Sequence, residues 1–95
     1  MISNTTENGI FSTRDLPLAA TLSTLGFSVV GVDFQLEGTR NLPIGYFKFD
    51  ETKELLDAEK KFNQGHIAIE PRVFLFNMRN LKARVTDGYQ NPHKQ

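Results

Sequence analysis

The residues best suited to chemistry are four basic side chains close together near the end of the chain: Arg72, Arg79, Lys82 and Arg84. A guanidinium group can hold two phosphate oxygens at once through parallel hydrogen bonds. Contacts between cations and phosphates supply most of the non-specific affinity of proteins for nucleic acids. We therefore predict that these four residues contact nucleic acid. The alternative is that they form an ordinary solvated face of a helix.

Three apolar side chains are interleaved with these basic residues: Val73, Leu75 and Phe76. An aromatic ring beside arginine can stack on a nucleobase. The same side chains can instead fill a second apolar contact, either within their own chain or against another protein. We predict that they are protein-interaction residues, which would serve a homodimer or the binding of a host protein.

Patterns for catalysis or metal binding are missing from the rest of the sequence. The glycine pair with the spacing of a phosphate-binding loop is followed by Val32 and Asp33, where such a loop needs Lys and Ser or Thr. Neither His66 nor His93 belongs to a motif that pairs a base with a nucleophile. The absence of Cys excludes disulfides and thiolate metal sites. We expect no enzymatic activity, no cofactor, no metal and no small-molecule substrate.

Charge is unevenly distributed, although the net charge of the 95 residues is zero. Residues 1–70 contain six Lys or Arg and ten Asp or Glu, a net charge of −4, whereas residues 71–95 contain five and one, a net charge of +4. This asymmetry indicates either a basic element with an acidic partner or two elements that neutralise each other. No apolar run reaches the about 18 residues of a membrane span, and the first residues lack the features of a signal peptide. We expect a cytoplasmic protein without membrane contact.

The first half of the sequence predicts a helix followed by two strands. The helix covers residues 15–25; Thr13 or Asp15 can cap it, and Gly26 can end it. Apolar and polar residues then alternate, as in half-buried strands of a hairpin, over residues 30–36 and 45–49.

The second half predicts two helices with a short strand between them. Asp50 can cap a helix over residues 51–63, residues 66–70 form a β-like stretch, and Pro71 begins a helix to about residue 85. The last helix carries an apolar stripe made of Phe74, Met78, Leu81 and Val85. At about 100° per residue, Arg72 and Arg79 lie about 20° apart, Lys82 lies about 60° further round, and Arg84 lies on another side.

Together these elements predict one compact α+β domain in the order α-β-β-α-(β)-α. Its small antiparallel sheet is built on the hairpin and covered by helices, because a two-stranded hairpin alone is only marginally stable. The domain covers residues 12–87. Polar, Asn- and Gly-containing ends predict flexible tails over residues 1–11 and 88–95.

The same segments, taken in order, resemble a small domain-of-unknown-function family of short prokaryotic proteins that are common in phage and prophage genomes. The resemblance covers residues 13–86 and depends on Thr13–Leu22 with Gly26, Phe47–Asp50, Gly65, Glu70–Phe74 and Arg79–Val85. This chain departs from the family in its longer hairpin connection and its additional N-terminal tail. The resemblance implies a phage-type accessory protein and brings no activity with it.

The function predicted from these observations is that of a small non-enzymatic accessory binding protein. It would make weak, non-specific contacts with nucleic acid through the basic C-terminal helix. The alternative is a protein-interaction module that self-associates or that binds and inhibits a host protein.

Overall fold

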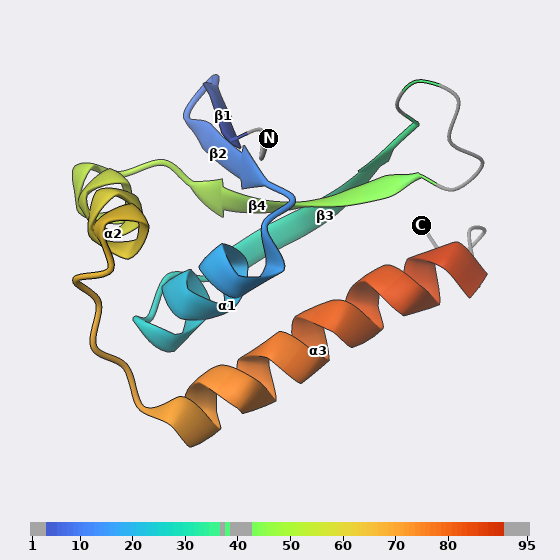
Figure 1. The fold of residues 1–95 in the computed structure, drawn as a ribbon. Helices are drawn as coiled ribbons and strands as arrows, with labels where there is room; N and C mark the ends of the chain where they lie inside the picture. The colour runs from blue at the N-terminus through green and yellow to red at the C-terminus, as the bar shows by residue number, and fades with distance from the viewer. Residues whose placement is uncertain (1–3, 37, 39–42, 91–95) are drawn as a thin grey trace.

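The computed structural model describes residues 4–36, 38 and 43–90. Its elements are β1 (Asn4–Glu7), β2 (Ile10–Thr13), α1 (Leu16–Thr24), β3 (Val29–Gln35), β4 (Ile44–Asp50), α2 (Lys53–Gln64) and α3 (Pro71–Gln90). The strands form one antiparallel sheet in the order β1-β2-β4-β3. In Figure 1, α1 and α3 lie on the same side of the sheet, and α2 lies near the end of β4. The predicted α+β class is confirmed.

The order of the elements, β-β-α-β-β-α-α, differs from the predicted one in two places. Two strands precede α1, where we expected none. Residues 66–70, expected as a short strand, belong to neither a helix nor a strand and connect α2 to α3. Ile67 and Ile69 are half-buried along this connection, so their alternation reflects partial burial without strand pairing.

The predicted N-terminal tail over residues 1–11 is wrong from residue 4 onward, and residues 1–3 lie outside the described part. β1 and β2 form a hairpin around Asn8 and Gly9, whose φ angles of 56° and 79° are both positive. This is the backbone that a two-residue type I′ turn needs, and Asn-Gly is its preferred sequence. Phe11 of β2 is only 1% exposed, so the hairpin contributes directly to the core.

β3 and β4 form the predicted hairpin, and their helix-facing side chains form the sheet side of the core. Val32 lies opposite Phe47, and Val29 lies opposite Phe49. The register shifts between Val29 and Gly31, so Val30 lies at a bulge. Most of the predicted loop between these strands, residues 37 and 39–42, lies outside the described part of the chain.

α1 begins and ends close to the predicted positions because both of its ends are encoded locally. The Asp15 side chain accepts a hydrogen bond from the Leu18 backbone N–H at 3.1 Å, which satisfies one of the free donors of the first turn. Gly26 follows the helix with a φ of 104°, which favours glycine. Leu18 and Leu22 are completely buried, so α1 is the central element of the fold.

α2 is capped by Thr52 rather than by the predicted Asp50, and it ends at Gly65 with a φ of 75°. Two consecutive hydrogen bonds between side chains link α2 to the N-terminal hairpin. Asn4 Nδ2 donates to Glu59 Oε2 at 2.9 Å, and the fully buried Thr13 hydroxyl donates to Asn4 Oδ1. β1 is therefore attached to α2 as well as to β2.

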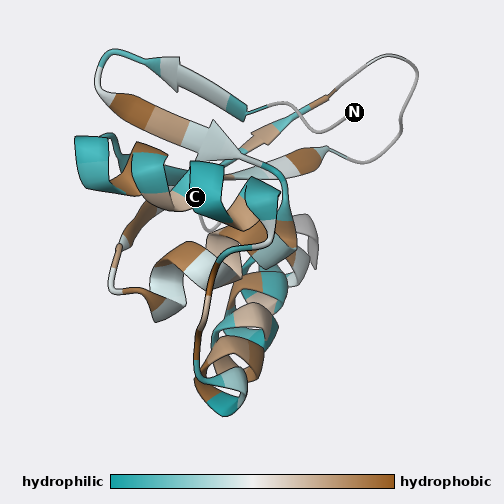
Figure 2. Cartoon of the chain, turned by 60° about the vertical axis from the view of Figure 1, so that its left-hand side comes forward, coloured by the Kyte–Doolittle hydropathy of each residue, from teal (hydrophilic) through white to brown (hydrophobic). Residues whose placement is uncertain are grey.

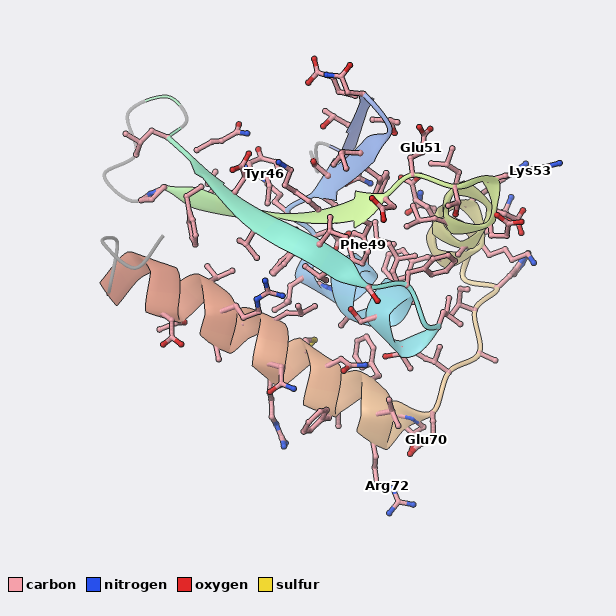
Figure 3. All side chains as sticks on the ribbon, turned by 180° about the vertical axis from the view of Figure 1, so that it is seen from behind. Tyr46, Phe49, Glu51, Lys53, Glu70 and Arg72 are labelled. Atoms are coloured by element: carbon pink, nitrogen blue, oxygen red, sulfur yellow. The ribbon has the colours of Figure 1, made fainter. Side chains whose placement is uncertain are left out.

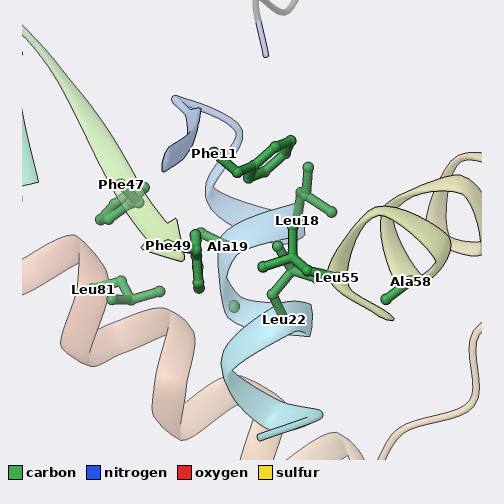
Figure 4. Close-up of a cluster of buried hydrophobic side chains, with 10 residues drawn as sticks. Phe11, Leu18, Ala19, Leu22, Phe47, Phe49, Leu55, Ala58 and Leu81 are labelled. Atoms are coloured by element: carbon green, nitrogen blue, oxygen red, sulfur yellow. The ribbon is translucent and has the colours of Figure 1, made fainter. Parts of the chain in front are cut away.

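The core lies between the sheet and the helices. Figure 4 shows side chains from β2, β4, α1, α2 and α3 gathered around α1. The buried apolar residues are Phe11, Leu18, Ala19, Ala20, Leu22, Phe47, Phe49, Leu55, Ala58 and Leu81. Phe74, Met78 and Val85 of α3 are partly buried against this cluster, which confirms the apolar stripe predicted for that helix.

α3 is longer than predicted and extends through Gln90, into the segment expected as a C-terminal tail. Residues 91–95 of that tail lie outside the described part. Glycines let the second half of α3 approach the sheet closely. A Cβ atom at Gly45 would lie 3.0 Å from a Val85 methyl group, and one at Gly88 would lie 2.6 Å from Phe34 Cε2. Side chains at these two positions would therefore push α3 away from β3 and β4.

Candidate functional site

α3 presents one side to the core and leaves the opposite side exposed. Figure 1 shows α3 along one margin of the molecule, with the other labelled elements all on the same side of it. In Figure 2, α3 carries both hydrophilic and hydrophobic segments along its length. The apolar stripe faces inward, so the residues on the remaining circumference are available to a partner.

Three of the four predicted basic residues lie together on this exposed side. Arg72, Arg79 and Lys82 are exposed and occupy about 80° of the helix circumference. They span about 15 Å along the axis, a length over which one strand of duplex DNA carries about four phosphates. Arg84 is also exposed, but it lies about 160° round the helix from Lys82. A flat contact therefore includes the first three and leaves out Arg84.

The electrostatic surroundings of these cations leave them largely uncompensated. No acidic residue occurs from position 71 through position 86. Glu70 lies at the start of α3, accepts a hydrogen bond from the Arg72 backbone N–H, and has its Oε1 3.8 Å from Arg72 Nε. The Arg72 side chain is 94% exposed, and an ion pair that is this exposed contributes little.

The predicted protein-interaction residues are also exposed on α3. Val73 is 45%, Leu75 44% and Phe76 63% exposed, so each of them leaves a large part of its surface open to a partner. Leu75 lies about 40° from Arg79, and Phe76 lies about 40° from Arg72. We define the outer face of α3 as Arg72, Leu75, Phe76, Arg79 and Lys82; Val73 lies on the flank beside it.

Beside the outer face, a groove of about 280 Å³ runs between α3 and β4. Its walls are apolar and include Leu16, Ile44 and Val85, with the buried Phe47 below them. Arg14 and Lys82 also line it, so Lys82 belongs to both the groove and the outer face. The role of Arg14 could not be predicted from the sequence, because no local pattern relates a residue before α1 to a residue in the middle of α3.

A second hollow, of about 450 Å³, lies on the face of the sheet opposite the helices. Tyr46 is buried in its lining, and Lys48 Nζ lies 3.5 Å from Asp33 Oδ2 across the β3–β4 pair. Figure 3 shows the Tyr46 side chain on the sheet, away from α3. This hollow could not be predicted from the sequence, because its polar lining residues come from all four strands.

The described residues contain no group of three or more His, Cys, Asp or Glu that could hold a metal ion. His66 is exposed, and its backbone N–H donates to the Lys61 carbonyl at 2.9 Å, which closes the end of α2. No helix in the described part of the chain is long and apolar enough to cross a bilayer.

No protein-family model matches the chain, and comparisons with curated proteins and with solved structures give no match. The resemblance to a family common in phage genomes therefore stays a prediction.

Proposed function

We propose that this protein is a small, non-enzymatic, cytoplasmic binding module, of phage accessory type, that contacts nucleic acid through the outer face of α3. The supporting observation is that Arg72, Arg79 and Lys82 share this face with the exposed Phe76, without an acidic residue between positions 71 and 86. The cations would bind phosphates. The phenyl ring would stack on an unpaired base, as aromatic side chains do in proteins that bind single strands.

The charge distribution defines how such a complex would form. Residues 1–70 carry a net charge of −4, which repels phosphates from the other surfaces of the molecule. Binding would therefore be centred on α3 and would be weak, in the non-specific range of about 10⁻⁴ to 10⁻⁶ M. With about three phosphate contacts, log affinity should fall with log salt with a slope of about −3 on duplex DNA and about −2 on single strands.

The test is a fluorescence-anisotropy titration at low salt with single-stranded DNA, duplex DNA and RNA. Arg79→Glu combined with Lys82→Glu should abolish binding, because it replaces two phosphate-binding cations by repelling carboxylates. Lys53→Glu combined with Lys60→Glu is the matched control: it makes the same change of net charge at two exposed positions of α2. The absence of binding at tens of micromolar protein, or an equal loss in the control, would contradict the proposal.

A second candidate function is that of a protein-interaction module, which a separate observation favours. Val73, Leu75 and Phe76 are large apolar side chains left exposed over little more than one turn of α3. Aromatic residues of this kind are enriched at the centres of protein interfaces. Sedimentation at high protein concentration tests self-association, and capture from the host tests a foreign partner. An apolar complex should persist at high salt, whereas a phosphate complex should dissociate.

A further inference from the structure

The groove between α3 and β4 combines an apolar lining with positive charge. Leu16, Ile44 and Val85 form its sides, and Arg14 and Lys82 are the charged residues along it. Purely apolar grooves favour uncharged ligands, but two cations beside an apolar surface favour a ligand that joins a flat apolar body to a negative charge. A nucleotide has this combination, because its base carries little charge and its phosphate is an anion.

The groove also lies where a nucleotide of a bound strand could enter it. Lys82 lies both in the groove and on the outer face of α3, so a strand bound along that face passes the mouth of the groove. The volume of about 280 Å³ lies just below the range of about 300–1,000 Å³ typical of sites for drug-sized molecules. A single ring system therefore suits it, and a base pair does not.

We infer that the groove between α3 and β4 accepts one unpaired nucleobase from a strand that is bound along the outer face, with Arg14 and Lys82 beside the adjoining phosphates. This inference rests on the proposed function and makes it more specific: the protein prefers single-stranded nucleic acid to duplex. Insertion of an unpaired base between apolar side chains is the way in which other proteins hold an extruded base. Pairing in a duplex would prevent it.

The experiment must separate the groove from Phe76, which can also stack on a base. We therefore use the Phe76→Ala variant and compare an intact single-stranded oligonucleotide with an abasic one of the same length, which keeps every phosphate. Anisotropy should show that the intact strand binds at least about fivefold more tightly, the lower end of the contribution of one stacked base.

Adding Thr86→Phe should then remove this difference. Thr86 is exposed and lines the groove, so a phenyl ring at this position occupies the space of the base without a change of charge. Asn63→Phe, at an exposed position of α2, is the matched control and should preserve the difference. A melting curve checks the folding of each variant, and the smaller Thr86→Leu replaces Thr86→Phe if the latter melts at a lower temperature.

The outcomes separate the inference from the proposed function. Equal binding of intact and abasic strands by the Phe76→Ala variant would overturn the groove site and leave the phosphate contacts of α3 intact. A preference for the intact strand that survives Thr86→Phe would also overturn it, because the base would then lie elsewhere. If the wild-type protein binds no oligonucleotide at all, the proposed function and the inference are both wrong.

Discussion

Replacement of Gly88 by alanine tests whether the second half of α3 is seated on the sheet as described. A Cβ atom at position 88 would lie 2.6 Å from Phe34 Cε2 and closer still to Cζ, below the 3.0 Å that real Cβ atoms keep. Such overpacking costs about 1–3 kcal/mol. Alanine is favoured over glycine within a helix by about 1 kcal/mol. We therefore expect Gly88→Ala to lower the free energy of unfolding by between about zero and 2 kcal/mol.

The sign of the effect should depend on Phe34. Leucine at position 34 lacks the ring atoms that the new methyl group would meet, so Gly88→Ala in the Phe34→Leu background should stabilise the protein by up to about 1 kcal/mol. The coupling energy between the two substitutions should thus be about 1–3 kcal/mol. Ala83→Gly, at an exposed position of the same helix, measures the helix-propensity contribution alone.

Urea denaturation gives these free energies, and melting temperatures support them, since 1 kcal/mol corresponds to about 4–8 °C for a domain of this size. Two results would refute the reasoning. One is that Gly88→Ala stabilises the wild-type protein by as much as Ala83→Gly destabilises it. The other is that Gly88→Ala has the same effect in both backgrounds. Either would mean that the Phe34 ring does not contact this turn of α3.

Four further substitutions test other contacts of the fold. Phe49→Ala should destabilise the protein by about 3–5 kcal/mol, because this ring is completely buried; Phe74→Ala should cost less in the same urea titration, because Phe74 is only half-buried. Asn4→Ala should cost about 1–3 kcal/mol, because it leaves the buried Thr13 hydroxyl without its acceptor; an unchanged melting temperature would contradict this. Phe76→Ser should change the stability by no more than about 0.5 kcal/mol, since the ring is mostly exposed; a large drop in melting temperature would show that the ring is buried.

The helices could be predicted from the sequence because their signals are local. Asp15 caps α1, Gly65 ends α2, and Pro71 begins α3 as expected. The helix end that was predicted wrongly, the C-terminal end of α3, has no such signal. α3 continues past residue 85 to Gln90, and Gly88, interpreted as part of a tail, is needed inside the helix for its contact with Phe34.

The N-terminal hairpin could not be predicted from the hydrophobic pattern, and its local signal is the turn sequence Asn8-Gly9. Both strands have only four residues, and β1 is polar throughout. β2 pairs with β4, which is distant in the sequence, and β1 joins the sheet only through β2. A short polar segment therefore becomes part of a sheet through a contact that no local window contains.

Part of the candidate site could likewise be predicted from a local pattern, and the rest depends on tertiary packing. The positions of Arg72, Arg79 and Lys82 follow from the helical period alone, and so does the separation of Arg84 from them. The groove and the place of Arg14 in it require the packing of α3 against β4. Whether Phe76 is buried by another part of the chain could be decided only when the position of every other element was known.

The strand order has a consequence for how the protein forms. β2 and β4 are neighbours in the middle of the sheet, although α1, β3 and the loop after it lie between them in the chain. During synthesis the β1–β2 hairpin therefore leaves the ribosome before its partner exists, and an isolated two-stranded hairpin is only marginally stable. Non-local strand pairing is slow, because the entropy of closing the intervening chain is lost before the contacts form. We expect the docking of this hairpin onto β4 to limit the rate of folding, and α1 to remain partly uncovered until it is complete.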